Sequence, residues 1–153
     1  VEDGFYDNTP LFRVVPGFLV QFGITLDAER RERWRSPVQD DPVVDVGGFR
    51  RGYLSFAGYG PHSRTTQIFI AYTDSDTLGT QPWETPFGRL ISGYGVIDKF
   101  YAGYGDVAPF NAHGPDQQRI EAEGKVYLDE NFPRLDYIQS CRVVWSGHPK
   151  TEL

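Results

Sequence analysis

The stretch from Phe12 to Gln21 constrains the fold more than any other part of the chain. It is an apolar run rich in branched residues, and it contains one arginine, Arg13, and one glutamine, Gln21. Such a run predicts a strand, and residues an even number of positions apart in an extended strand share a face. We therefore expect Arg13 and Gln21 on one face. An isolated arginine in an apolar strand is unusual and suggests a specific role for its charge.

A Pro16-Gly17 dipeptide interrupts this run. Inside a strand, such a dipeptide marks a kink or a bulge, because proline cannot donate to the ladder and glycine weakens it. Phe18 has the opposite parity to Arg13, so only a kink would bring its ring to the face that holds the guanidinium. The prediction is a small pocket that combines a planar cationic donor, an amide and an aromatic ring.

Turn-forming residues divide the rest of the chain into short apolar runs. The 153 residues, the size of one domain, include 17 Gly and 11 Pro, and 15% are aromatic. This favours a β-rich domain over a helical bundle. Strands are expected over 53–56, 66–72 and 137–145, a short helix between the glycine turns at 93–95 and 103–105, and a helix over 117–131. Gly124 weakens this last assignment.

The strand expected over 66–72 alternates cleanly. Ile68 and Ile70 fall on one face, and Gln67 and Phe69 fall on the other. If the isoleucines face the core, Gln67 and Phe69 reach the opposite surface. They would then lie beside the face of Arg13, provided that the two strands are neighbours.

The charge pattern restricts the classes of partner. A formal net charge of −6 argues against a nucleic-acid partner, which needs a clustered basic surface. The arginines between Arg30 and Arg35 alternate with glutamates, so a solvated loop or short helix is favoured over an anion-binding patch. No window approaches the ~18 apolar residues of a membrane span. A soluble chain is expected, and its compartment stays open.

The remaining reactive side chains give no sign of metal or covalent chemistry. The histidines His62, His113 and His148 are scattered, and none stands with cysteines or carboxylates at the spacing of metal ligands. The single cysteine, Cys141, lies in a branched run and is expected to be a small buried side chain rather than a nucleophile. No metal and no cofactor are expected. A pocket with one cation and apolar walls suits a reaction that makes and breaks no bond.

Three blocks of sequence follow one another along the chain. They are Phe12–Gln21 with its Pro-Gly-Phe, Ser55–Ile70 with its Gly-Pro and Gln-x-Phe-Ile, and Phe87–Ile91 with its Phe-Gly-Arg. Together they resemble the cyclophilin family of peptidyl-prolyl isomerases, in the order that the family has them. The segment Asp106–Pro133 resembles an insertion typical of a bacterial and algal branch of that family.

The resemblance implies a mainly β fold, an antiparallel barrel of the cyclophilin type with one or two flanking helices. Residues 1–145 would form this domain, and 146–153 a C-terminal tail. Val1–Tyr6 resembles the end of the family's first helix, so two strands and most of that helix would be missing at the N-terminus. A barrel without two strands has exposed edges. We therefore expect a larger protein assembly, or an N-terminal segment outside this sequence, to complete it.

The resemblance also implies a site and a substrate. The substrate would be a proline-containing polypeptide, and Arg13, oriented by Gln21, would be catalytic. The substrate-binding residues would be Phe18, Leu19, Ala57, Gln67, Phe69 and Leu78, of which Phe18, Leu19, Phe69 and Leu78 would form the apolar pocket for the proline ring. Ordinary core packing is the competing interpretation for the two phenylalanines.

Departures from the family pattern leave the function open. Tyr59 stands where the family has a small residue and would crowd the groove, and Trp83 or Glu84 stands about where the family often has His. The leading hypothesis is an isomerase that rotates Xaa-Pro bonds and assists protein folding. The alternative is a catalytically weak or inactive binding or scaffold subunit of a larger complex. A third, an anion-binding domain that uses Arg30 to Arg35, is least favoured.

Overall fold

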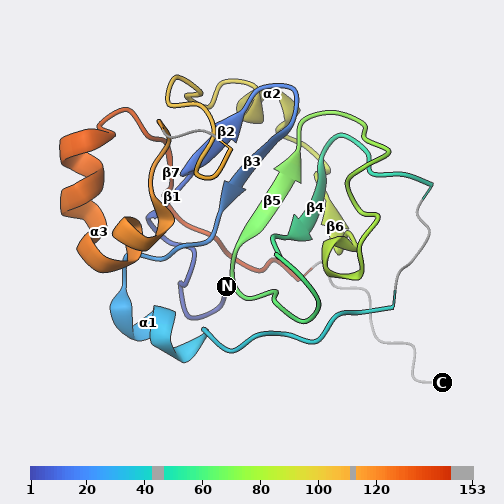
Figure 1. Ribbon diagram of the computed structural model, residues 1–153, viewed down its shortest axis with the longest axis horizontal. Coiled ribbons are helices and arrows are strands. Elements are labelled where there is room, and N and C mark those ends of the chain that lie inside the picture. Colours follow the sequence, from blue (N-terminus) through green and yellow to red (C-terminus); the bar gives the residue numbers. More distant parts are fainter. Residues whose placement is uncertain (43–46, 111–112, 146–153) are drawn as a thin grey trace.

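An antiparallel sheet organises the molecule (Figure 1). The computed structural model describes residues 1–42, 47–110 and 113–145. Within these ranges five strands lie in the order β2-β3-β5-β4-β6, and every neighbouring pair is antiparallel. Their bounds are Arg13–Val15 for β2, Leu19–Phe22 for β3, Tyr53–Phe56 for β4, Ile68–Ala71 for β5 and Gly88–Arg89 for β6. A second sheet pairs β1, Thr9–Pro10, with β7, Tyr137–Ile138.

The stretch from Phe12 to Gln21 is a hairpin, so the single kinked strand expected there was wrong. Pro16 and Gly17 form the tip between β2 and β3, and the backbone N–H of Phe18 donates to the Val15 carbonyl at 3.0 Å. Gly17 has φ of 73°, as the third position of a type II turn requires. Proline before it supplies the fixed negative φ of the second position. The chain therefore reverses at this dipeptide instead of bending.

Three α-helices and one 3-10 helix flank the sheet in the described part of the chain. They are α1, Ala28–Arg33, α2, Tyr94–Ile97, α3, Gln117–Asn131, and the 3-10 helix η1, Pro82–Glu84. Asp27 caps α1 by accepting from the Arg30 N–H at 3.0 Å, and Asp116 caps α3 by accepting from the Arg119 N–H at 2.9 Å. Of these helices, none is long and apolar enough to cross a membrane.

The helices exceed the one or two that were expected. The alternating charges around Arg30 allowed either a loop or a short helix, and the structure has a short helix there, α1. α3 occupies the expected residues, and Gly124 interrupts it with φ of 62° and ψ of −136°, so two helical segments meet at a kink. Such dihedral angles are open mainly to glycine.

Apolar side chains pack on both faces of the sheet. Val20 and Ile70 are register partners on one face and belong to a cluster that α2 completes with Ile97. Leu19 and Phe69 lie on the other face in a separate cluster. The alternation expected for β5 is therefore confirmed. A third cluster lies under α3 and contains Phe12, Ile24, Val107, Ile120, Tyr127, Leu128 and Leu135.

The closed barrel expected for the chain is not present in the described residues. The strand order leaves β2 and β6 as open edges, because β2 pairs only with β3 and β6 pairs only with β4. Next to β6, the residues Phe87 and Ile91 are 52% and 91% exposed. The fold is therefore a mixed one, an open β-sheet with flanking helices.

The strand expected over 137–145 is shorter than expected. It ends at Ile138, and three residues later the backbone N–H of Cys141 donates to the Asp7 carboxylate at 2.8 Å instead of continuing a ladder. Cys141 is half-buried against the first cluster, where the sequence suggested a buried side chain. The tail expected over 146–153 lies outside the described residues.

Candidate active site

A pocket of about 750 Å³ opens on the face of the sheet that carries Leu19 and Phe69. All eight residues singled out from the sequence line it, namely Arg13, Phe18, Leu19, Gln21, Ala57, Gln67, Phe69 and Leu78. Arg13, Leu19, Gln21 and Phe69 come from β2, β3 and β5. The other four come from neighbouring segments: Phe18 follows the turn at Gly17, Ala57 follows β4, Gln67 precedes β5 and Leu78 follows β5. The structure brings together all the side chains that the resemblance grouped into one site.

Strand register places the polar side chains of this wall in a line. Arg13 pairs with Gln21 across the β2–β3 hairpin, and Gln21 pairs with Phe69 on β5. Side chains on one face of neighbouring strands meet directly or diagonally, so Gln67, two residues before Phe69, also reaches Gln21. The hairpin thus gives the shared face that the sequence suggested, by cross-strand pairing rather than by parity within one strand.

A relay of hydrogen bonds runs along this line. Arg13 Nη1 donates to Gln21 Oε1 at 3.0 Å, Gln21 Nε2 donates to Gln67 Oε1 at 2.7 Å, and Gln67 Nε2 donates to Gln117 Oε1 at 3.0 Å. Gln21 is buried. Because its amide nitrogen is engaged by Gln67, its oxygen faces the guanidinium. The relay therefore fixes one side of Arg13.

Asp106 engages the other side of the guanidinium. Arg13 Nε donates to Asp106 Oδ1 at 2.6 Å, and Arg13 Nη2 donates to Asp106 Oδ2 at 3.2 Å. Only 11% of the Arg13 side chain and 21% of the Asp106 side chain are exposed. Asp106 comes from the loop between α2 and α3, and sequence reasoning missed it as a site residue. A half-buried arginine is expected to have a carboxylate partner, but the sequence around Arg13 does not show which acidic residue that is.

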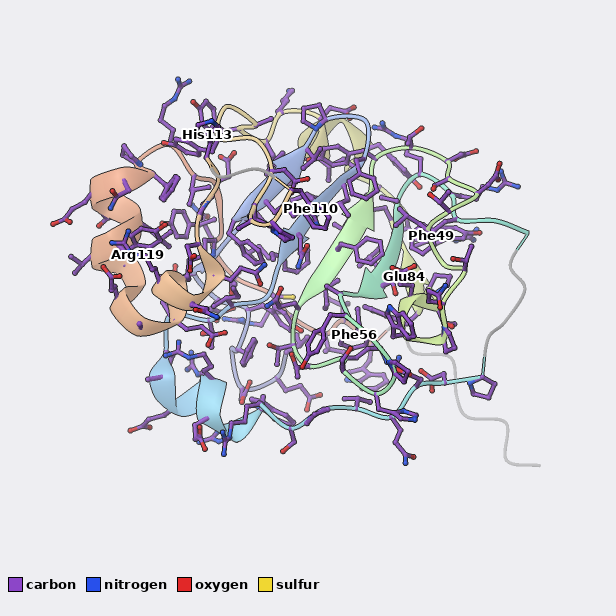
Figure 2. All side chains as sticks on the ribbon, viewed as in Figure 1. Phe49, Phe56, Glu84, Phe110, His113 and Arg119 are labelled. Carbon is purple, nitrogen blue, oxygen red and sulfur yellow. The ribbon has the colours of Figure 1, made fainter. Side chains whose placement is uncertain are left out.

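Two aromatic rings flank the guanidinium. The Arg13 Cζ atom lies 5.6 Å from the centroid of Phe18 and 5.0 Å from that of Phe110, distances at which a cation is attracted by a ring face. Figure 2 shows Phe110 in the loop that lies over β2 and β3, and Glu84 near β4 on the other side of β5. Sequence reasoning did not assign Phe110 to the site.

Tyr59 and Glu84 lie on the wall at the positions where the chain departs from the family pattern. Tyr59 is 93% exposed, so its ring extends into solvent at the rim instead of filling the groove. Burial raises the pKa of the Glu84 carboxyl above its usual value, and the Gly79 N–H that donates to it at 3.1 Å opposes this shift. Of Trp83 and Glu84, the two residues that stand about where the family often has His, Glu84 lines the pocket and places a carboxyl group on its wall.

Metal ligands do not gather in the described part of the chain, where no three His, Cys, Asp or Glu side chains are arranged to hold an ion. His62 lies beside Asp40, with its Nδ1 atom 3.6 Å from a carboxylate oxygen. His148 lies outside the described residues.

Comparison with known proteins identifies relatives for most of this chain. The family model described as cyclophilin type peptidyl-prolyl cis-trans isomerase/CLD matches residues 1–122, which include every side chain of the pocket wall. Peptidyl-prolyl cis-trans isomerase B of Escherichia coli strain K12 is 32% identical over 105 residues, which cover 64% of this chain and 63% of that protein.

Two fungal relatives are similar to the same extent. Peptidyl-prolyl cis-trans isomerase-like 1 of Gibberella zeae is 34% identical over 109 residues, which cover 65% of this chain and 61% of that protein. Peptidyl-prolyl cis-trans isomerase-like 2 of Cryptococcus neoformans is 33% identical over 101 residues, which cover 63% of this chain and 17% of that protein. The matched region thus spans less than two thirds of the length of each of these relatives.

A solved structure supports the fold. The crystal structure of a Cryptosporidium parvum cyclophilin type peptidyl-prolyl cis-trans isomerase, in the presence of the dipeptide Ala-Pro, superposes with a TM-score of 0.54 at 24% identity and covers 74% of this chain and 71% of that chain. This likeness shows the fold, and the family model that matches residues 1–122 shows the descent. The chain belongs to the cyclophilin type peptidyl-prolyl cis-trans isomerase family.

Proposed function

We propose that this protein is a peptidyl-prolyl cis-trans isomerase that rotates Xaa-Pro bonds in polypeptides and so assists protein folding. The observation that carries the proposal is a guanidinium, that of Arg13, held on the wall of a pocket that also presents an apolar slot. The slot consists of Phe18, Leu19, Phe69 and Leu78. A proline ring is the apolar part of the substrate that such a slot would hold.

The proposed mechanism rests on differential binding of a twisted amide. The barrier to rotation, about 18–20 kcal/mol, is the resonance of the peptide C–N bond. At the twisted transition state the prolyl nitrogen regains a lone pair that accepts a hydrogen bond. In the described residues, Arg13 uses three of its five N–H bonds on Asp106 and Gln21. The other two are available to meet that lone pair, which either planar isomer lacks.

Arg13 supplies only part of the acceleration. Shortening an uncatalysed time of roughly tens of seconds to milliseconds takes about four decades in rate, or about 5–6 kcal/mol. One hydrogen bond from a charged donor contributes about 1.5–3 kcal/mol. The remainder is assigned to the slot, which holds the ring while the preceding carbonyl turns, and to Gln67 and Ala57, which would contact the substrate backbone.

The open rim supports catalysis over simple binding. Tyr59 was the side chain whose position across the slot would have favoured a scaffold, and its 93% exposure leaves the groove clear. The anion-binding alternative gains nothing, because the pocket at Arg31 and Arg35 is also lined by Glu32 and Glu121. An isomerase acting on proline-containing polypeptides is therefore the function that this geometry supports best.

A binding subunit of a larger assembly remains the second candidate. The observation that favours it is the open edge at β6, next to which Phe87 and Ile91 are exposed. An additional strand from another protein, or from a segment of this protein beyond the sequence described here, would cover that edge. The two candidates differ in whether proline peptides are turned over or only bound.

An isomerisation assay on an Ala-Pro tetrapeptide tests the proposal. Arg13→Ala is expected to lower kcat/KM by about 10- to 150-fold, the equivalent of one charged hydrogen bond. The matched control is Arg89→Ala, which removes an exposed arginine of β6 outside the pocket and is expected to change the rate less than twofold. A parent protein that binds the peptide without catalysing its isomerisation would reject the isomerase in favour of the binding subunit. An Arg13→Ala variant as active as an active parent would reject Arg13 as the catalytic residue.

A further inference from the structure

We propose that Asp106 is a positioning residue of this site, which holds the Arg13 guanidinium in the one orientation that presents its free N–H bonds to the substrate. The inference rests on the proposed isomerase function and adds to it a residue that lies 93 positions from Arg13 in the chain. Two observations support the inference. The Asp106 carboxylate makes two hydrogen bonds to the Arg13 guanidinium, and hydrogen bonds and packing hold the loop that contains Asp106 in place.

The contacts of Arg13 define the plane of its guanidinium. Asp106 binds the Nε and Nη2 edge at 2.6 and 3.2 Å, and Gln21 binds Nη1 from another direction at 3.0 Å. The rings of Phe18 and Phe110 lie 5.6 and 5.0 Å from Cζ. A planar group that is held on two edges has little rotational freedom left, and its unused N–H bonds point in fixed directions. With Gln21 alone, the long side chain would pivot about one hydrogen bond.

The carboxylate is itself fixed by its own loop. The Val107 backbone N–H donates to Asp106 Oδ1 at 2.7 Å, and the Gly114 N–H donates to the Asp106 carbonyl at 3.1 Å. Val107 is buried in the cluster under α3, beside Ile120. A Cβ atom on Gly114 would lie 2.4 Å from the Asp106 carbonyl oxygen, so the approach of these two backbones requires glycine. Asp106 is therefore anchored to the core, as a positioning group must be.

The pair also carries little net charge on the Arg13 side of the pocket, because one guanidinium is matched by one carboxylate. Both side chains are mostly buried, so water screens their attraction less than at a surface pair. Asp106 neutralises the positive charge of Arg13 without removing its two unused N–H bonds. The parent site therefore uses Arg13 as an oriented donor, and an acidic residue next to the proline gains little attraction from it. Without the negative charge of Asp106, the positive charge of Arg13 would be uncompensated and would attract an acidic substrate residue.

The test is Asp106→Asn in the full-length protein, assayed by isomerisation of two peptide series that carry Glu or Lys immediately before the proline. We expect kcat to fall by about 5- to 20-fold while KM changes less than twofold, because orientation at the transition state is lost and the slot is retained. We also expect the ratio of kcat/KM for the Glu peptide to that for the Lys peptide to rise at least threefold. A purely structural role would leave this ratio unchanged.

Asp98→Asn is the matched control. It removes a carboxylate that binds Arg51 Nη2 at 2.7 and 2.9 Å, on the surface and outside the pocket. It is expected to leave kcat and the charge preference within twofold of the parent. Asp106→Glu is the second variant, which keeps the charge and displaces it by one methylene. It is expected to lower kcat without shifting the charge preference, and it keeps the test decisive if Asp106→Asn does not fold.

The results for the parent protein and for Arg13→Ala together separate the two proposals. If Arg13→Ala costs activity and Asp106→Asn leaves both kcat and the charge preference unchanged, the role of Asp106 is refuted and the isomerase stands. An Asp106→Asn variant faster than the parent would likewise refute positioning, since it would show that the carboxylate restrains Arg13 from acting. If the parent binds proline peptides without isomerising them, the proposed function itself fails; if an active parent loses nothing in Arg13→Ala, the roles of Arg13 and Asp106 both fail. Because Asp106 acts through Arg13, the double variant is expected to be no slower than Arg13→Ala alone.

Discussion

At the scale of one residue, the burial of Glu84 on the pocket wall makes its ionised carboxylate unfavourable for stability. Its carboxyl is half-buried on the wall, and burial raises its pKa above the ordinary value of 4.5, against the opposing Gly79 hydrogen bond. A raised folded-state pKa means that the folded protein prefers the protonated carboxyl. The stability that this group contributes is therefore complete below pH 4.5 and is lost as the pH rises through the raised pKa.

Glu84→Gln is expected to stabilise the protein at neutral pH and not in acid. At pH 7 the variant lacks the buried charge, so its urea midpoint should lie above that of the parent, whereas at pH 3.5 both side chains are neutral and the midpoints should agree. Glu130→Gln, on the exposed surface of α3, is the control and should shift the midpoint little at either pH. A stabilisation of equal size at both pH values would contradict the electrostatic explanation.

Gly124 sets the shape of α3 at the scale of an element. Its φ of 62° and ψ of −136° bend the helix, so that the N-terminal segment brings Gln117 to Gln67 while Tyr127 and Leu128 pack in the cluster under the helix. No atom within 4 Å would contact a Cβ there. The cost of a side chain at this position is therefore one of backbone conformation alone.

Gly124→Ala is expected to lower the free energy of unfolding by about 1–3 kcal/mol, because alanine is strained at these dihedral angles. Gly95→Ala in α2 is the matched control, since it too meets nothing within 4 Å but has no positive φ. It should be neutral, or stabilising by up to about 1 kcal/mol from helix propensity. Urea denaturation of both variants measures the difference. Equal effects would show that the kink at Gly124 does not depend on glycine.

Arg64 joins distant segments at the scale of the whole molecule. Its side chain is 2% exposed and donates to Asp40 at 3.1 Å, to Asp41 at 2.9 Å and to the Gln39 carbonyl. The contact ties the segment after α1 to the segment before β5, next to Thr65 of the pocket wall. A buried charge without its partner is costly, because neither water nor another group then solvates it.

Arg64→Met is expected to lower the free energy of unfolding by about 3–5 kcal/mol, because it leaves the buried Asp40 carboxylate without its cation. The control is Arg50→Met, which breaks an exposed pair with Asp74 and should cost no more than about 1 kcal/mol. Urea denaturation at pH 7 compares them. A loss at Arg64 no larger than that at Arg50 would mean that the segment after α1 is not held by this charge cluster.

The sequence by itself determined the features that depend on neighbours a few positions away. The alternation of Ile68, Phe69 and Ile70 predicted both faces of β5, and Gly124 marked the weak point of α3. The sequence blocks also contain seven of the eight expected side chains that line one pocket, and the eighth, Leu78, was implied by the family resemblance. Periodicity and sequence motifs are local properties, so they can be recognised without knowing how the rest of the chain folds.

Only the tertiary structure decided how these pieces meet. It made Pro16-Gly17 a hairpin turn and paired Arg13 across the strands with Gln21, where a kinked single strand had satisfied the same pattern. It left the sheet open in the described residues, and it brought Asp106 to Arg13. The physical reason is distance along the chain. The partner of a half-buried charge is determined by how remote segments pack together, so the sequence near Arg13 does not identify Asp106 as its partner.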